Sequence, residues 1–223
     1  SRNQLNVGFT TEEEDRLRYY LHNLKGTVAG RFLWQLGTDT VGRLGLMSLQ
    51  NCALVVVDSP IRPFTWAFDA LMLGSGVGFN IQREFVYKLP PVLPDFKAPQ
   101  RVDAKDADLI VPDTREGWVQ LLHHTLSTDF YKRDAYKARF TYSTHCVRGK
   151  GAAIKGFGGV ASGPEDLVRG ISQISSVLEA RCGEQLRPID CLDIMNIIGS
   201  VVVAGNVRRS AQIAIGDCDD LQY

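Results

Sequence analysis

Apolar and polar positions follow one another in patterns that predict strands and helices in succession. The runs CALVVV at 52–57 and VGFNI at 77–81 have the length and composition of short strands. PFTWAFDALMLG between them has helical spacing and places Phe64, Phe68 and Leu71 on one side. Strand, helix and strand in this order form a right-handed βαβ unit. Continuous apolar character also predicts a first strand that is buried on both faces, so the fold class is α/β, with a parallel sheet or barrel.

Further elements are predicted on either side of this unit. TTEEEDRLRYYLHNL at 10–24 predicts a helix with a threonine cap and acidic residues in its first turn. The glycine-punctuated stretch at 26–45 predicts irregular structure. Pro164 suits the first position of another helix, a further helix is expected from residue 188, and AQIAIG at 211–216 is expected to be a strand.

A proline-rich segment interrupts the predicted α/β core. KLPPVLPDFKAPQ at 88–100 cannot form a regular element. It leads to a helix expected at 113–127, with Asp113 or Thr114 as N-cap, and ARFTYS at 138–143 predicts one more strand. The expected organisation has four parts. A helical and irregular segment at 1–50 is followed by a first βαβ unit of the sheet or barrel at 51–83. An insertion at 84–153 precedes the resumed core at 154–223, which has a loop after its last helix.

Composition and charge narrow the possible partners. The chain of 223 residues is 44% hydrophobic and carries 25 basic and 25 acidic residues, so it has no global basic field for nucleic acid or an anionic membrane. No apolar run approaches the roughly 20 residues that span a bilayer, and no secretory signal is present. We therefore expect a cytoplasmic location. Both ends fall within polar segments, which indicates a fragment of a longer protein.

The cysteine pattern leaves room for one functional thiol. Five cysteines occur, without a C-x-x-C pair or zinc-finger spacing, so neither a metal site nor a disulfide framework is expected. They are Cys52, Cys146, Cys182, Cys191 and Cys218. Cys52 opens the first predicted strand. From its position alone, a small buried packing residue is favoured over a reactive sulfur.

Three polar or glycine-rich motifs have open alternatives. GSGVGFN follows a helix and opens a strand, which excludes a dinucleotide-binding fingerprint and leaves close approach to a neighbouring strand or to a ligand. GFGGVASGP precedes a helix and can hold a phosphate or be an ordinary cap, although Glu165 and Asp166 already compensate the helix dipole. The adjacent arginines of AGNVRRS are either surface residues or readers of phosphate and base edges. His123 and His124 lack metal-ligand spacing and are interpreted as structural.

Taken together, five motifs resemble one enzyme family. SLQNCALVVV, PFTWAFDALMLGSGVGFNI, VPDTREGW, GFGGVASGP and VVAGNVRRSAQIAIG occur in the order seen in adenosylcobalamin-dependent (class II) ribonucleotide reductases, most like the monomeric ribonucleoside-triphosphate reductases. The resemblance runs from Gly30 to Gly216. It implies the first half of a ten-stranded α/β barrel, with an inserted effector-binding region in place of a second subunit.

The resemblance also implies roles for particular residues. Cys52 corresponds to one of two redox-active cysteines that reduce the ribonucleotide. The residues expected to line the substrate pocket are Asn51, Ser75 and Gly76. The residues expected to form the allosteric specificity site are Asp69, Ser162, Gly163, Asn206, Arg208 and Arg209. No metal ligand is expected.

The implied reaction removes the 2′-hydroxyl of a ribonucleoside triphosphate by thiyl-radical chemistry. Adenosylcobalamin would generate the radical. A C-terminal half outside this chain would hold most of the cofactor and would supply the thiyl cysteine and the partner of Cys52. No N-P-C-x-E segment occurs in this chain, so the chain by itself is expected to be inactive. Expected partners are the substrate, a deoxynucleoside triphosphate effector, a thioredoxin-type reductant and that other half. Two alternatives are a non-catalytic nucleotide-binding module and, less favoured, a glycyl-radical reductase on the same barrel.

Overall fold

The structure is a computed structural model that describes residues 8–130, 139–153, 160–204 and 211–222. It consists of two compact units, of which the first extends to Asn51 and the second begins at Cys52. None of the helices in these described ranges is long and apolar enough to cross a membrane.

The first unit is helical. Helix α2 (Thr11–His22) begins with a capping box, in which Thr10 Oγ1 accepts a hydrogen bond from the Glu13 N–H at 3.3 Å and Glu13 Oε2 accepts one from the Thr10 N–H at 2.8 Å. These two bonds pair backbone donors that helix formation leaves free. The predicted N-terminal helix and its threonine cap are confirmed.

The prediction of irregular structure at 26–45 is wrong. This stretch contains α3 (Gly30–Gln35) and α4 (Asp39–Leu44), and the 3₁₀ helix η1 (Leu46–Leu49) follows it. Gly37 and Gly45 have φ angles of +87° and +75°. Gly37 and Gly45 therefore lie outside the two α-helices, at positions that need left-handed backbone, whereas Gly30 and Gly42 are part of α3 and α4 and do not prevent helix formation.

The second unit contains the predicted parallel sheet. Strands β1 (Cys52–Val56), β2 (Gly76–Asn80) and β6 (Gln212–Ile215) pair in the order β1-β2-β6. Helix α5 (Arg62–Met72) joins the first two strands, which confirms the βαβ unit. Its apolar side is buried, since Phe64, Phe68 and Leu71 are at most 2% exposed.

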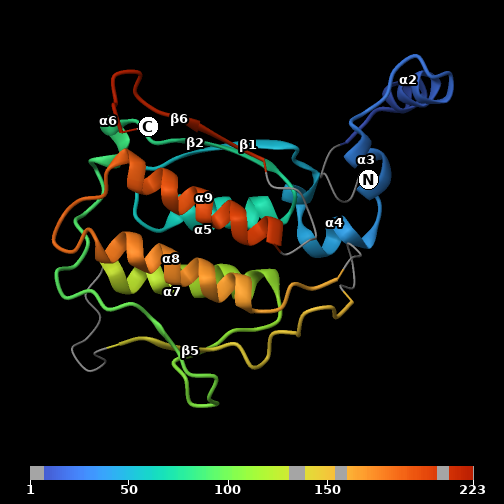
Figure 1. The fold of residues 1–223 in the computed structure, drawn as a ribbon. Coiled ribbons are helices and arrows are strands. Elements are labelled where there is room, and N and C mark those ends of the chain that lie inside the picture. Colours follow the sequence, from blue (N-terminus) through green and yellow to red (C-terminus); the bar gives the residue numbers. More distant parts are fainter. Residues whose placement is uncertain (1–7, 131–138, 154–159, 205–210, 223) are drawn as a thin grey trace. The chain divides into compact units, whose positions relative to one another are not determined.

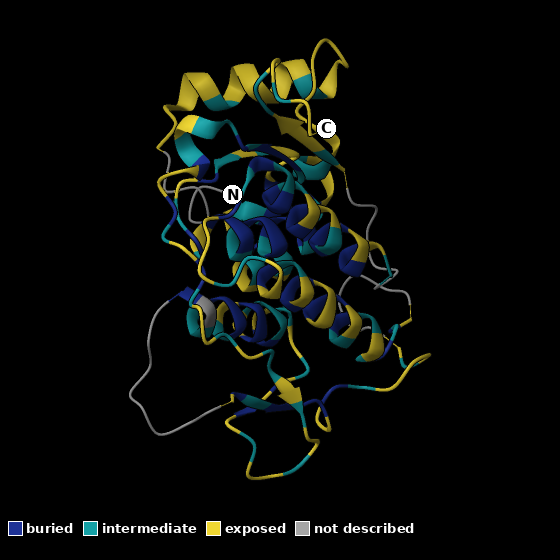
Figure 2. Ribbon diagram, turned by 60° about the vertical axis from the view of Figure 1, so that its left-hand side comes forward, coloured by how far each residue is buried: buried dark blue, intermediate teal, exposed yellow. Residues whose placement is uncertain are grey.

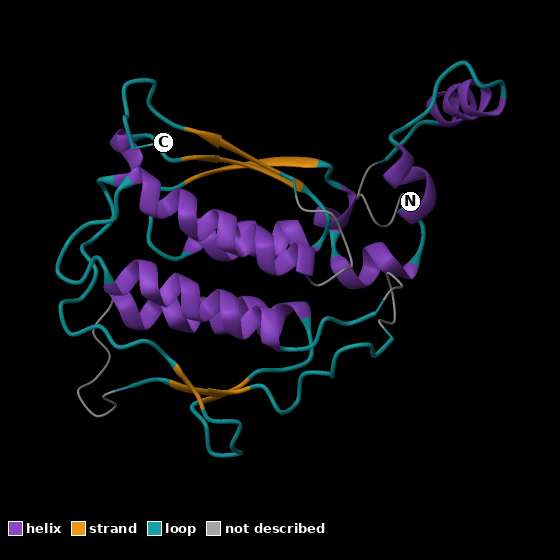
Figure 3. Ribbon diagram, in the orientation of Figure 1, coloured by secondary structure: helices purple, strands orange, loops and turns teal. Residues whose placement is uncertain are grey.

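Four helices form the core below this sheet. Helices α5 and α9 (Pro188–Ala204) lie against the sheet, and α7 (Arg115–Phe130) and α8 (Glu165–Glu179) form a second layer beneath them (Figures 1 and 3). All four line a small apolar cavity of about 10 Å³. Gly170 of α8 permits the close approach of α9, because a Cβ there would lie 2.3 Å from Val201 Cγ2.

A second small sheet belongs to the predicted insertion. It consists of β3 (Gln100–Arg101), β4 (Leu109–Ile110) and β5 (Thr141–Ser143), in the order β3-β5-β4 and all parallel, and the short helix α6 (Arg83–Val86) precedes it. Asp103 accepts hydrogen bonds at Oδ1 from the Thr144 N–H and hydroxyl, at 2.8 and 3.0 Å. Arg101 pairs with both Asp103 and Glu165, which ties this sheet to the first turn of α8.

Two predicted details need correction. The first strand is not buried on both faces: Leu54 of β1 is 59% exposed and Ile213 of β6 is 67% exposed, because the helices cover one face of the sheet (Figure 2). Pro164 is the N-cap of α8 and not its first residue. The expected helix at 113–127 is confirmed with Thr114 as its cap, since Thr114 Oγ1 accepts from the Gly117 N–H at 3.0 Å.

A buried carboxylate joins the end of α8 to the start of α9. The side chain of Asp190 is 8% exposed and accepts hydrogen bonds from Arg187 at its backbone N (2.8 Å), Nε (3.0 Å) and Nη2 (2.9 Å). Arg181 Nε lies 3.1 Å from Asp190 Oδ2. Burial by itself would raise the pKa of Asp190, but the Arg187 hydrogen bonds and the Arg181 charge outweigh it and lower the pKa.

We expect Asp190→Asn to lower the free energy of unfolding by about 1–3 kcal/mol at pH 7, because the amide cannot satisfy both arginines. The folded-state pKa of Asp190 lies below its unfolded value, so its contribution is complete above about pH 4 and is lost as the pH falls through the folded pKa. Denaturant unfolding at several pH values measures this difference. Asp193→Asn, an exposed change on the same helix, is the control. If the difference in unfolding free energy between the unmodified chain and Asp190→Asn did not become smaller in acid, the lowered pKa of Asp190 would be contradicted.

Candidate functional site

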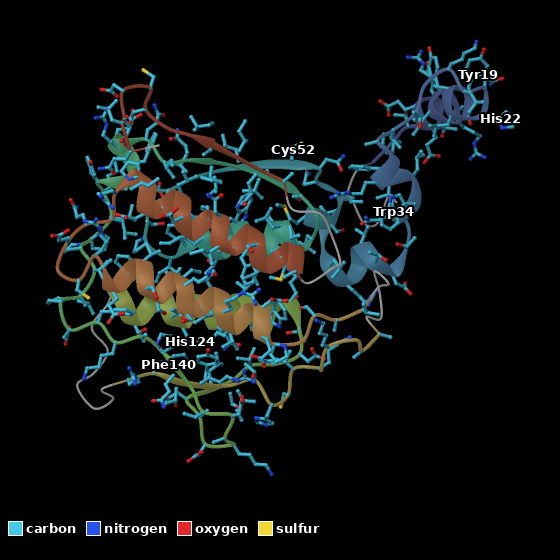
Figure 4. All side chains as sticks on the ribbon, viewed as in Figure 1. Tyr19, His22, Trp34, Cys52, His124 and Phe140 are labelled. Carbon is cyan, nitrogen blue, oxygen red and sulfur yellow. The ribbon has the colours of Figure 1, made fainter. Side chains whose placement is uncertain are left out.

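Cys52, Ser75 and Gly76 come together where the strands of the sheet begin. Cys52 opens β1 (Figure 4). It pairs directly with Gly76, which opens β2. The thiol of Cys52 is free and its residue is exposed, whereas Ser75 is 1% exposed. The predicted redox cysteine and two of the predicted substrate residues therefore share the amino end of the sheet. Asn51 precedes Cys52 in the chain and is exposed.

The glycine turn after α5 determines where β2 begins. Gly74 has a φ of +86°, its N–H donates to Leu71 O at 2.8 Å, and the Ser75 N–H donates to Ala70 O at 3.0 Å. These two bonds form a Schellman motif, which ends the helix and requires a left-handed residue. The motif directs the chain into β2 directly opposite Cys52.

One of the two explanations for the glycines of GSGVGFN applies at Gly78. A Cβ at Gly78 would lie 2.8 Å from Leu54 Cδ1 and 3.3 Å from Ile213 Cγ2. Side chains of both neighbouring strands thus fold over this glycine. At Gly78 the requirement is close approach to neighbouring strands.

The described cysteines do not provide a disulfide partner for Cys52. All five thiols are free. Cys218 follows β6, which runs parallel to β1, so it lies beyond the carboxyl end of the sheet, more than about 13 Å along the strands from Cys52. A disulfide needs Cα atoms within about 7 Å. Cys191 is fully buried, and this burial raises the pKa of its thiol.

The predicted effector residues that the structure describes lie at helix ends. Asp69 is in the last turn of α5 and forms an ion pair with Arg115, the first residue of α7. Ser162 and Gly163 immediately precede α8, where Gly163 has a φ of +82°. Asn206, Arg208 and Arg209 lie outside the described residues, so AGNVRRS is not tested.

These helix ends and strand starts meet at one end of the second unit. The Asp69–Arg115 pair joins the end of α5 to the start of α7, and the Gly170–Val201 approach joins the start of α8 to the end of α9. The strands β1, β2 and β6 begin at this same end (Figure 1). The described candidate residues of both predicted sites in this unit therefore lie toward the same end of it, Cys52, Ser75 and Gly76 in the sheet and Asp69, Ser162 and Gly163 at the helix ends.

Sequence reasoning missed the ion pairs that the side chains of VPDTREGW form. Besides Arg115, this motif contributes Asp113, whose Oδ2 accepts a hydrogen bond from Arg148 Nε at 2.6 Å. Arg148 Nη1 also donates to Ala153 O at 3.0 Å. The motif was recognisable, but nothing in it indicates which residues its charges meet.

The two adjacent histidines have packing contacts. The His124 ring stacks on Phe140 with centroids 5.5 Å apart, and Ser127 Oγ lies 3.3 Å from His123 Nδ1. Among the described residues, no group of three or more His, Cys, Asp or Glu side chains is arranged to hold a metal ion.

Comparison with known proteins identifies the relationship. A family model described as "B12-dependent ribonucleotide reductase, insertion domain" matches residues 97–178. Adenosylcobalamin-dependent ribonucleoside-triphosphate reductases from Lactobacillus delbrueckii subsp. bulgaricus, Lactobacillus leichmannii and Lacticaseibacillus paracasei are 37%, 36% and 34% identical to the chain and align with 96% of it. The chain is a homologue of the class II ribonucleotide reductases. The family predicted from the five motifs is confirmed.

The homology covers only part of each relative. The chain spans 34%, 34% and 35% of the three reductases, about a third of their length. A crystal structure of a B12-dependent (class II) ribonucleotide reductase matches 97% of the chain and 36% of its own, with a TM-score of 0.77 and 31% identity. The α/β fold with parallel sheets and the presence of an insertion domain are confirmed. The ten-stranded barrel and the predicted domain boundaries stay predictions.

Proposed function

We propose that this chain is the part of a class II ribonucleotide reductase that carries one reducing cysteine and the allosteric specificity site. The observation that carries the proposal is the exposed thiol of Cys52 opposite Gly76, in a homologue of ribonucleoside-triphosphate reductases. The substrate is then a ribonucleoside triphosphate, with Asn51, Ser75 and Gly76 lining its pocket. The effector is a deoxynucleoside triphosphate.

Cys52 supplies half of the reducing equivalents in this proposal. It and a second thiol outside the described residues together give up two electrons and two protons and form a disulfide, while the 2′-hydroxyl of the substrate leaves as water. A thioredoxin-type protein reduces this disulfide between turnovers. Exposure of Cys52 at the end of a strand suits both tasks, because the sulfur must meet a substrate and a second thiol in turn.

The proposed effector site lies at the same end of the sheet. Asp69, Ser162 and Gly163 belong to it, and Asn206, Arg208 and Arg209 of the loop after α9 remain predicted members. The N-terminus of α7 favours an anion there, whereas Glu165 and Asp166 already compensate the dipole at the start of α8.

The complete enzyme would use adenosylcobalamin, as the names of the relatives indicate. In the part of this chain that the structure describes, the cavities include the 10 Å³ hole between the helices and an open groove beside α9 lined by polar and apolar residues, and neither encloses a corrinoid. We therefore place the cofactor mainly on polypeptide outside this chain and derive no step through it. Bound there, it supplies the radical.

The alternative is a nucleotide-binding module without catalysis, which the missing partner of Cys52 among the described thiols favours. A mixture of this chain with the remaining two thirds of a relative separates the two functions. We expect cobalamin-dependent reduction of a ribonucleoside triphosphate, with a rate that deoxynucleotides change. A folded complex that binds deoxynucleotides but reduces nothing would support the module instead.

A further inference from the structure

The turn between Pro112 and Gly117 is a rigid start for α7. The Thr114 N–H donates to Pro112 O at 2.8 Å, and Thr114 Oγ1 accepts from the Gly117 N–H at 3.0 Å. A Cβ at Gly117 would lie only 2.5 Å from Pro112 O. Backbone therefore lies directly against backbone, and Asp113 and Arg115 leave this turn in fixed positions.

The charged side chains of Asp113 and Arg115 form ion pairs with different segments of the second unit. Arg115 pairs with Asp69 of α5, and the two side chains are 21% and 34% exposed. Asp113 pairs with Arg148, and these side chains are 32% and 34% exposed. Such half-buried pairs are screened less by salt than fully exposed ones.

Arg148 extends the second contact to the segment before α8. Its Nη1 donates to Ala153 O, and Ala153 pairs with Val160 in an antiparallel bridge. The Ala161 N–H donates to Ala152 O and the Gly151 N–H to Ala161 O, both at 2.8 Å. The two chain segments run together as far as Gly163, where a Cβ would lie 3.1 Å from Lys150 N. The position of Ser162 and Gly163 therefore depends on the hydrogen bonds that Arg148 forms with Asp113 and Ala153.

We propose that Asp113, Arg115 and Arg148 are positioning residues of the nucleotide site. Through one rigid turn they hold Asp69 of α5 and Ser162–Gly163 before α8 at a constant separation. Arg115 also compensates the charge of Asp69, which would otherwise repel a polyphosphate. This inference rests on the proposed effector site and explains why VPDTREGW carries both charges.

Binding of dATP, dGTP, dCTP and dTTP to the full chain, measured by calorimetry, tests the proposal. For the nucleotide that binds best, we expect Arg115→Gln, Asp113→Asn and Arg148→Gln each to weaken binding about tenfold or more. The double variant Asp113→Asn/Arg148→Gln should lose no more than Arg148→Gln alone, because that single change already removes the contact that Asp113→Asn removes. The exchanged pair Asp113→Arg/Arg148→Asp should recover part of the affinity.

Arg83→Gln is the matched control. It breaks the Arg83–Asp217 pair, whose side chains are 39% and 22% exposed, beyond the carboxyl end of the sheet. Its affinity should equal that of the unmodified chain at a temperature where all variants are folded. Unchanged affinity in the three single variants, or additive losses without recovery in the exchanged pair, would overturn the positioning role alone. Absence of binding by the unmodified chain would overturn the proposed effector site and the positioning role with it.

Discussion

Replacement of Cys52 by serine is expected to abolish multiple-turnover reduction of a ribonucleoside triphosphate when this chain is completed with the remaining polypeptide of a relative. A hydroxyl cannot form the disulfide that carries away two electrons, so the variant cannot supply the two electrons that each turnover consumes. Deoxynucleotide binding should be unchanged, because Asp69 and Gly163 do not contact Cys52 in any described interaction. Product formation over many turnovers, with a thioredoxin-type reductant present, is the measurement.

Cys218→Ser is the matched control for this prediction. Its thiol is also exposed, but it follows β6 at the carboxyl end of the sheet, so turnover should be retained. Thiol labelling of the folded chain should modify Cys52 and leave the buried Cys191 unmodified until the chain unfolds. Full turnover in Cys52→Ser would refute the redox role, even if labelling shows that the thiol is accessible.

Gly117→Ala is expected to produce a large loss of stability for one added methyl group, about 2–3 kcal/mol. The new Cβ would lie 2.5 Å from Pro112 O and 2.8 Å from Pro112 Cδ, and a proline backbone cannot move aside without disrupting the start of α7. The higher helix propensity of alanine offsets at most about 1 kcal/mol of this cost. Denaturant unfolding gives the change in stability.

Gly149→Ala is the control for that substitution, because nothing lies within 4 Å of a Cβ at Gly149. We expect its stability to stay within about 0.5 kcal/mol of the unmodified chain. Equal stabilities for the two variants would mean that the turn at Pro112 is not as tight as described. Gly117→Ala should also weaken deoxynucleotide binding if the turn positions Asp113 and Arg115.

Local sequence signals predicted many elements of the fold correctly. The apolar run after Asn51, the amphipathic helix that buries Phe64 and Phe68, and the glycine turn after it predicted a βαβ unit that the structure contains. The frequent glycines at 26–45 wrongly indicated irregular structure, because Gly37 and Gly45 end short helices while Gly30 and Gly42 lie within them. The burial of β1 predicted from its apolar residues was also too high. A run of apolar residues does not reveal whether helices cover one face of the strand or both.

The sequence by itself determined the strand, helix and strand of the βαβ unit, the cap of α2, the end of α5 and the place of Cys52 at the start of a strand. These depend on residues within a few positions of one another, through side-chain caps and left-handed glycines. Only the tertiary structure decided that Cys52 faces Gly76, that Arg115 meets Asp69 and that Arg148 meets Asp113. Those contacts join residues 24, 46 and 35 positions apart, and their geometry follows from how the four helices and the sheet pack.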